Sequence, residues 1–203
     1  MSVSSLAPLH SAAQAPLRAV RLGRFELALE HRPDGALLIR ATNELDPYPA
    51  RLTSCLTHWA RTAPERRFLV QRDASGAWRA LTYAEVLREV RRIGAALLQR
   101  DLSPHRPVVI LSGNDIDHAL LGLAAMHVGI PFAPISPAYS LLSTDYGKLR
   151  TIMGLVTPGL VFASDGAPFA RAIEAVVPPD VEIVVTRNPP PNRPATPACC
   201  PAC

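Results

Sequence analysis

The sequence predicts an α/β fold, in which a parallel sheet with flanking helices is accompanied by small β-hairpins. Short, wholly apolar segments alternate with helical segments over residues 108–186, as in parallel sheets that are covered on both faces. Nearer the start, two pairs of short apolar runs flank turn sequences. The chain has 203 residues, of which 48% are hydrophobic, so it can bury a sizeable core.

The first elements expected along the chain are two hairpins and a short helix. Pro33, Asp34 and Gly35 form a turn sequence between the first two apolar runs, and Gly76 lies in the turn sequence of the second pair. Between the hairpins, apolar positions recur at helical spacing from residue 51 to Pro64. The four predicted strands comprise residues 25–29, 37–40, 68–71 and 78–81.

A capping box opens the longest predicted helix. Glu85 follows Thr82 by three residues, so the Thr82 hydroxyl would accept from the Glu85 backbone N–H while the Glu85 side chain reaches back. The apolar stripe of this helix consists of Val86, Val90, Ile93 and Leu97. The opposite face is expected to carry Arg88, Glu89, Arg92 and Arg100.

The alternating region predicts right-handed crossovers between parallel strands. Its strands are expected at residues 108–111, 131–134, 160–163 and 181–186, and its helices at 115–127, 144–156 and 168–176. Asn114 is expected to be the N-cap of the first of these helices, and Gly129 is expected to end it in the left-handed conformation. Pro131 is expected to start the following strand, where no ladder donor is needed.

Composition argues against several functional classes. The net charge is +4, the arginines are scattered, and aromatic residues make up only 5%, so we expect no nucleic-acid partner. The apolar stretch 119–135 is interrupted by His127 and two prolines, and it is too short for a membrane span. Cys55 is isolated and the other three cysteines crowd near residue 203, which is unlike a secreted disulfide framework. A cytoplasmic location is therefore expected.

Both ends of the chain are expected to lie outside a folded domain of residues 25–187. Residues 1–24 contain three arginines and no acid, which is typical of a disordered tail and superficially resembles a transit peptide. Residues 188–203 contain six prolines and three cysteines without apolar periodicity, so they are expected to be unstructured and unable to continue a sheet. The change of composition at residue 188 fits either a disordered tail or an out-of-frame continuation, and we favour the second.

Several segments match the conserved elements of a known enzyme class. They read LTYAEV at 81–86, VVILSGND at 108–115, LAAMHVGIPFAP at 123–134, SPAYSL at 136–141, GKLR at 147–150 and TPGLVF at 157–162. These segments resemble acyl- and aryl-CoA synthetases of the adenylate-forming superfamily. Together with YPARLT at 48–53 and HWA at 58–60, they are most similar to feruloyl-CoA synthases.

The resemblance implies that residues 25–187 are a partial AMP-binding domain, the amino-terminal part of the adenylate-forming fold. In the full-length family, ATP, Mg²⁺ and coenzyme A convert a hydroxycinnamate such as ferulate into its CoA thioester. A triphosphate needs a Ser/Thr/Gly-rich loop with a lysine, and nothing here fits that loop. Gly113, Gly122 and Gly129 are isolated, and Lys148, the only lysine, lies in a helical stretch.

The family's ribose-binding acid, metal-binding glutamate and catalytic lysine would all lie beyond residue 203. We therefore expect no catalytic, cofactor-binding or metal-binding residue in this chain, and no ligase activity from it alone. Three explanations stay open: a truncated fragment, a non-catalytic subunit or interaction module that completes a split ligase, and an incomplete record of a longer enzyme. The strand at 181–186 would leave an open sheet edge through which the chain could self-associate.

Other candidate sites have simpler interpretations. Cys200 and Cys203 have CxxC spacing, but they lie in the expected tail, where accidental clustering is favoured over metal or redox chemistry. His118 and His127 are nine residues apart and need not share a helix face, so they are expected to be packing residues. The acidic residues expected at the surface or as helix caps are Asp101, Asp115 and Asp117.

Overall fold

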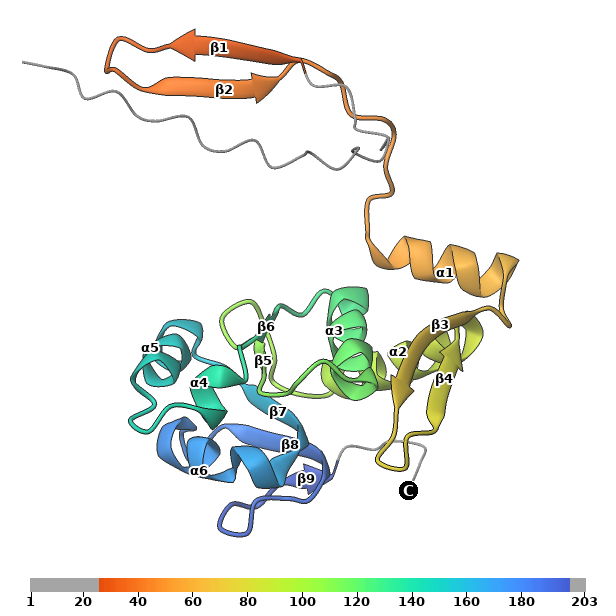
Figure 1. The fold of residues 1–203 in the computed structure, drawn as a ribbon, viewed down its shortest axis with the longest axis vertical. Coiled ribbons are helices and arrows are strands. Elements are labelled where there is room, and N and C mark those ends of the chain that lie inside the picture. Colours follow the sequence, from red (N-terminus) through yellow and green to blue (C-terminus); the bar gives the residue numbers. More distant parts are fainter. Residues whose placement is uncertain (1–25, 198–203) are drawn as a thin grey trace, which may run out of the picture. The chain divides into compact units, whose positions relative to one another are not determined.

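The computed structural model describes residues 26–197, which divide between Tyr48 and Pro49 into two compact units (Figure 1). The tail expected at residues 1–24 and the CxxC pair Cys200 and Cys203 lie outside the described residues. The first unit contains one hairpin, and the second contains all the other described elements.

The hairpin of the first unit confirms the sequence-based prediction. Strands β1 (Leu27–His31) and β2 (Leu37–Ala41) pair in antiparallel fashion. Gly35 adopts a φ of 83°, a left-handed conformation that glycine tolerates without a steric penalty. The Asp34 carboxylate accepts a hydrogen bond from the backbone N–H of Ala36 at 3.0 Å. The turn residues thus set the register of the two strands.

The second unit begins with a helix and a further hairpin, as the sequence predicts. Helix α1 (Thr53–Thr62) is followed by β3 (Arg67–Arg72) and β4 (Trp78–Thr82), which pair in antiparallel fashion. The ring of Phe68 stacks on that of Tyr83 with a centroid distance of 4.5 Å. This stacking joins the hairpin to the start of the next helix.

Helix α2 (Tyr83–Leu98) begins with the predicted capping box. The Glu85 backbone N–H donates to Thr82 Oγ1 at 3.3 Å, and the Thr82 backbone N–H donates to Glu85 Oε2 at 2.8 Å. The hydrogen bond from the Thr82 N–H is the main reason why the pKa of the Glu85 carboxyl lies below its ordinary value.

Replacing Thr82 with alanine is expected to lower the free energy of unfolding by about 1 kcal/mol, because the Glu85 backbone N–H at the start of α2 loses its partner.

The Glu85 carboxylate stabilises the fold in full above its ordinary pKa of 4.5, and this stabilisation is lost as the pH falls through the lower folded-state pKa. Urea denaturation of the wild type and of Glu85→Gln at decreasing pH measures this effect. The stability difference should shrink on acidification, and a difference that does not change with pH would contradict the assignment.

In the described part of the second unit, the centre is a five-stranded, wholly parallel sheet in the order β6-β5-β7-β8-β9. Its strands are β5 (Val108–Ile110), β6 (Phe132–Pro134), β7 (Leu160–Asp165), β8 (Glu182–Arg187) and β9 (Thr196–Pro197). The connecting helices are α3 (Ile116–Val128), α4 (Ala138–Leu141), α5 (Gly147–Val156) and α6 (Gly166–Val176). The predicted α/β alternation is confirmed, and α4 and β9 are additional.

Helices cover both faces of this sheet (Figure 1). On one face, Val108 and Ile110 pack with α2 and α3 in one core cluster. On the other face, Val109 and Leu111 pack with α5 and α6 in a second cluster. Successive strand residues point to opposite faces, so a strand covered on both faces must be apolar throughout. This requirement explains the short, wholly apolar strand segments of the sequence.

The structure corrects the expected starts of one helix and one strand. The N-cap of α3 is Asp115 instead of Asn114, since the Asp115 carboxylate accepts from the backbone N–H of His118 at 2.8 Å. Strand β6 begins at Phe132, so Pro131 precedes the strand instead of starting it. Each expected boundary differs from the observed one by a single residue, because the sequence offers two adjacent residues that suit the position equally well.

The glycine expected at the end of α3 is confirmed, and the start of α5 differs from the prediction. Gly129 has a φ of 79° and donates its N–H to the carbonyl oxygen of Ala125. Helix α5 begins at Gly147 instead of about residue 144, because the Asp145 carboxylate first forms a turn with Ser143 and the Gly147 N–H. The hydrogen bond from Gly147 is the main cause that lowers the pKa of Asp145.

Strand β9 contradicts the expectation that no residue after 187 can continue the sheet. Thr196 and Pro197 pair with β8, and the Arg193 guanidinium donates to the carbonyl oxygen of Val177 at 3.0 Å. Proline is compatible with this position because the outer side of an edge strand needs no ladder donor. Strand β8 is therefore flanked on both sides, and the expected open edge at 181–186 is wrong. Among the strands of residues 26–197, those at the edges of the sheet are β6 and β9.

Candidate functional site

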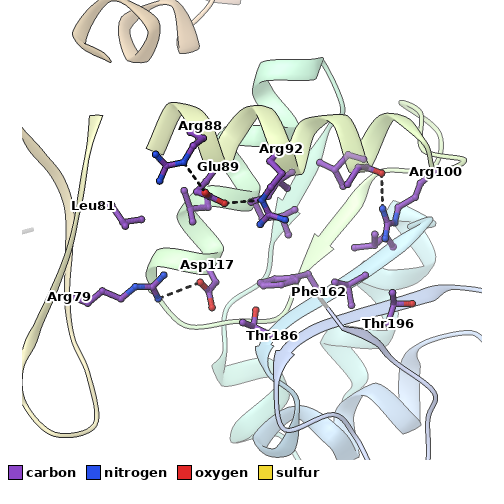
Figure 2. Close-up of a pocket in the computed structure, with 17 residues that line it drawn as sticks. Arg79, Leu81, Arg88, Glu89, Arg92, Arg100, Asp117, Phe162, Thr186 and Thr196 are labelled. Atoms are coloured by element: carbon purple, nitrogen blue, oxygen red, sulfur yellow. Dashed lines mark hydrogen bonds and ion pairs between the residues drawn. The ribbon is translucent and has the colours of Figure 1, made fainter. Parts of the chain in front are cut away.

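A cavity of about 290 Å³ lies between α2, α3, the β4 strand and one face of the sheet (Figure 2). Its walls consist of apolar side chains from these elements, namely Leu81, Ile93, Ala96, Leu97, Leu120, Leu121, Leu160, Phe162 and Val184. Polar side chains occur at its margin, where Thr186, Thr196 and several charged residues lie. The cavity is therefore apolar inside and charged around its rim.

Glu89 lies at this rim. The sequence analysis placed it on the helix face opposite the apolar stripe, and the structure corrects that expectation. Its side chain is buried, and its carboxylate accepts from Arg92 Nε at 3.0 Å and lies 3.5 Å from Arg88 Nε. The signal was present in the sequence, because Glu89 follows Val86 by three residues and precedes Ile93 by four. It thus belongs to the apolar stripe, and the two arginines compensate its burial.

Asp117 was expected at the surface or as a cap, and this expectation is also wrong. The side chain is only 8% exposed, and its oxygens lie 3.9 Å from Arg79 Nη1 and 3.8 Å from Arg187 Nη1. Both distances are longer than a hydrogen bond, and Asp117 Oδ1 has no hydrogen-bond partner among the described residues. The cavity rim therefore contains a buried acceptor that the described part of the chain does not satisfy.

A further ion pair lies beside the cavity, just after the end of α2. Arg100 donates to Glu182 through Nε at 2.8 Å and through Nη2 at 3.2 Å, and its Nη1 donates to the carbonyl oxygen of Ala96 at 2.7 Å. This bidentate pair fixes the carboxyl end of α2 to strand β8. Figure 2 shows Arg88, Arg92 and Arg100 following one another along α2, and Arg79 directed toward Asp117.

The carboxyl ends of β5 and β7 form a second place where a ligand could be expected. Strand β5 leads into α3 on one face, and its neighbour β7 leads into α6 on the other face. Open α/β sheets bind ligands at such a switch point, in the crevice between the diverging loops. Free polar side chains at this crevice would be candidates for binding a ligand.

The polar groups at the switch point are engaged with one another. The Ser164 backbone N–H donates to Ser112 Oγ at 2.8 Å, and the Ser164 hydroxyl donates to the Asp115 carboxylate. Asp115 also caps α3, and His118 Nδ1 lies 2.9 Å from the carbonyl oxygen of Gly113. Asp115 is thus a capping acid, as expected. This cluster ties the two loops together and leaves the apolar cavity as the better candidate site.

The glycines and the lysine do not come together in one loop. Gly113 follows β5, whereas Gly122 lies inside α3, where an added Cβ would be 3.1 Å from the ring of Phe132. Lys148 lies on α5, with its Nζ 5.5 Å from the centre of the Tyr139 ring. These residues therefore have local structural roles in the described part of the chain.

The remaining candidates also lie apart. Asp101 is exposed and pairs with Arg106 at 3.2 Å, so it is a surface acid as expected. His127 lies on α3 with a buried Nδ1 that has no hydrogen-bond partner in the described region. Between residues 26 and 197, no three His, Cys, Asp or Glu side chains are placed to hold a metal ion. No helix in that same range is long and apolar enough to cross a membrane.

Comparisons with known proteins agree with this architecture. A family model described as "AMP-binding enzyme" matches residues 56–199. Among solved structures, the acyl-CoA synthetase of Brucella canis is similar with a TM-score of 0.57 at 18% identity, over 72% of this chain and 25% of that one. VinN is similar with a TM-score of 0.56 at 21% identity, over 69% of this chain and 32% of that one.

A third similar structure is the fatty acyl-adenylate ligase from L. pneumophila in complex with acyl adenylate and pyrophosphate. Its TM-score is 0.52 at 18% identity, over 66% of this chain and 22% of that one. None of the curated proteins matches the chain. At these identities the structural likeness shows the fold alone, and the chain spans only 22% to 32% of the three structures.

Proposed function

The chain belongs to the AMP-binding enzyme family, and from this membership we propose that it is a partial domain of an ATP-dependent carboxylate–CoA ligase. We propose a hydroxycinnamate such as ferulate as the acid, and no ligase activity for this chain alone. The observation that carries the proposal is the family match over residues 56–199, which includes the whole parallel sheet. The choice of ferulate rests on the sequence motifs that resemble feruloyl-CoA synthases.

Inactivity of the chain alone is supported by the residues at the switch point, which do not fit a triphosphate. The side chains of Ser112 and Ser164 are buried and already hydrogen-bonded, and the nearby Asp115 carboxylate would repel a polyanion. Lys148 contacts Tyr139 on a helix and belongs to no glycine-rich loop. We therefore propose no catalytic role for these residues, and we assign ATP, Mg²⁺ and coenzyme A to the complete enzyme.

The purified chain is expected to form no feruloyl-CoA when it is incubated with ferulate, ATP, Mg²⁺ and coenzyme A. The measurement is the absorbance of the thioester, with a full-length acyl-CoA synthetase and its own substrate as the control for the reagents. Loss of the whole set of electrostatic contacts to a transition state should leave no measurable turnover. Turnover that requires both ATP and coenzyme A would overturn the proposed inactivity.

A second candidate function is that of a non-catalytic subunit that completes a split ligase. The apolar cavity favours it, because half-buried apolar side chains such as Ile93 and Ala96 line a space that the described residues leave open. In this case the chain would restore thioester formation to a separate polypeptide that carries the rest of the ligase. Mixing or co-expressing the two polypeptides tests this function, and no gain over either one alone would exclude it.

A further inference from the structure

We propose that two copies of this chain exchange residues 189–197, here called the strap, and so form a domain-swapped dimer. In this dimer, the strap of each copy adds the edge strand β9 to the β8 strand of the other copy. Three observations support the proposal: the strap leaves β8 through a strained residue, its first residues are stiff, and its contacts can form equally well between copies. The proposal goes beyond the proposed function and does not depend on it.

The strap leaves β8 at Asn188, which we call the hinge. Asn188 has a φ of 48°, in the left-handed region, where residues other than glycine meet a steric penalty that is smaller for asparagine than for most others. The next residue is Pro189, and a proline makes the residue before it favour an extended backbone. The closed hinge is therefore strained, and the strain is relieved if the chain leaves β8 in an extended conformation.

The first residues of the strap are stiff. Pro189, Pro190 and Pro191 follow one another, and the ring of each proline fixes its φ at about −65°. A run of prolines favours the extended polyproline II conformation, so these residues cannot take over the positive φ of the hinge. A stiff segment that follows a strained hinge favours exchange between two copies over closure within one copy.

The contacts that hold the strap all follow the hinge in sequence. The Arg193 guanidinium donates to the carbonyl oxygens of Val177 and Pro178 at 3.0 Å and 2.9 Å, at the carboxyl end of α6. Ala195 packs against the core cluster that α5 and α6 form with the sheet, and β9 pairs with β8 (Figure 1). None of these contacts requires the strap and the domain to belong to the same copy.

A second copy of the chain is the partner that these contacts fit. Its strap has the same arginine and the same strand, so its complementarity to α6 and β8 is the one observed within the chain. Exchange across a two-fold axis is reciprocal, so β8 keeps its neighbour in both copies. The dimer loses the independent motion of one copy, and the relief of strain at two hinges opposes this cost.

The test compares two substitutions of the hinge in the full chain. Asn188→Gly relieves the strain, whereas Asn188→Val increases it, because a β-branched residue tolerates a positive φ poorly. Both remove the hydrogen bond from the Asn188 side chain to Asp165, so they differ only in strain. Each chain is refolded from urea at low and high protein concentration, and size-exclusion chromatography with light scattering measures the dimer fraction. Asn188→Val should dimerise at least about tenfold more tightly than Asn188→Gly, because each dimer relieves two hinges.

Two further positions in the strap provide controls. Asn192 is exposed and does not have a positive φ, so Asn192→Gly and Asn192→Val should dimerise equally. Arg193→Gln removes hydrogen bonds that the monomer and the swapped dimer share, so it should leave the dimer affinity at the wild-type value. It should only speed the exchange between the two states, since the strap then opens more easily. Circular dichroism checks that each variant keeps the wild-type helix signal.

Several outcomes would overturn the proposal. The absence of a dimer of Asn188→Val at high concentration, or equal dimer affinities of the two hinge variants, would exclude exchange driven by the hinge. A dimer that Arg193→Gln strengthens would mean that displaced straps leave β8 edges that pair directly with each other. If Asn188→Val does not fold, Asn188→Ala replaces it, because alanine also meets a penalty at a positive φ. The measurement needs no ATP or coenzyme A, so its outcome is independent of the thioester assay.

Discussion

Replacing Leu149 with alanine is expected to lower the free energy of unfolding by about 2–5 kcal/mol, the usual cost of truncating a fully buried leucine. Leu149 lies on α5 with no exposed side-chain surface, in the core cluster between α5, α6 and the sheet. Its removal takes apolar contacts from this layer and leaves a cavity, because close-packed neighbours relax only in part. The result therefore reports whether α5 is packed on the sheet.

The same helix offers a matched control. Leu155 lies on α5 but is 79% exposed, so Leu155→Ala changes helix propensity equally and should alter stability by no more than about 0.5 kcal/mol. Urea denaturation followed by circular dichroism compares the two variants with the wild type. Equal stability losses in the two variants would show that α5 does not bury the face described here.

Gly166→Ala is expected to cost about 1–3 kcal/mol, because the added methyl group has no room. An added Cβ at Gly166 would lie 2.6 Å from the carbonyl oxygen of Asn188 and 2.9 Å from Pro190 Cδ. The segment after β8 would have to move away from the start of α6. This variant directly tests whether the proline-rich residues beyond 187 are packed on the domain, contrary to the expectation from composition.

Gly154→Ala is the control for this substitution. Gly154 lies on α5 with open space around it, so alanine should raise helix stability by about 0.5–1 kcal/mol. Stability measurements and amide hydrogen exchange distinguish the two glycines. In Gly166→Ala, exchange within residues 182–197 should become faster. A stabilising effect at both positions would mean that the segment after β8 is not held against α6.

Elements that depend on residues close in sequence could be predicted well. Thr82 and Glu85 form their capping box, Gly129 ends its helix in the left-handed conformation, and Gly35 makes its hairpin turn. Each of these features depends on backbone geometry within a few residues, so the amino-acid types suffice. The apolar strands likewise predict a sheet covered on both faces, because strand residues alternate between the two faces.

The candidate site could be predicted only in part. Ile93 and Leu97 belong to the apolar stripe of α2, and both line the cavity. The spacing of Glu89 could have predicted that it shares this stripe. The compensation of its charge by Arg88 and Arg92 could not be predicted, because it depends on where the side chains lie in the structure. Asp117 gives no local signal at all, because Arg79 and Arg187 reach it from distant parts of the chain.

The sequence by itself determined the α/β class, the caps and turns, and the resemblance to the family to which the chain belongs. Tertiary structure alone decided that Asp117 is buried with an unsatisfied oxygen, and that Thr196 and Pro197 add an edge strand to β8. The physical reason is one of range. Propensity and periodicity act over one or two turns of chain, whereas burial of a charge and pairing of an edge strand depend on residues brought together by the whole fold.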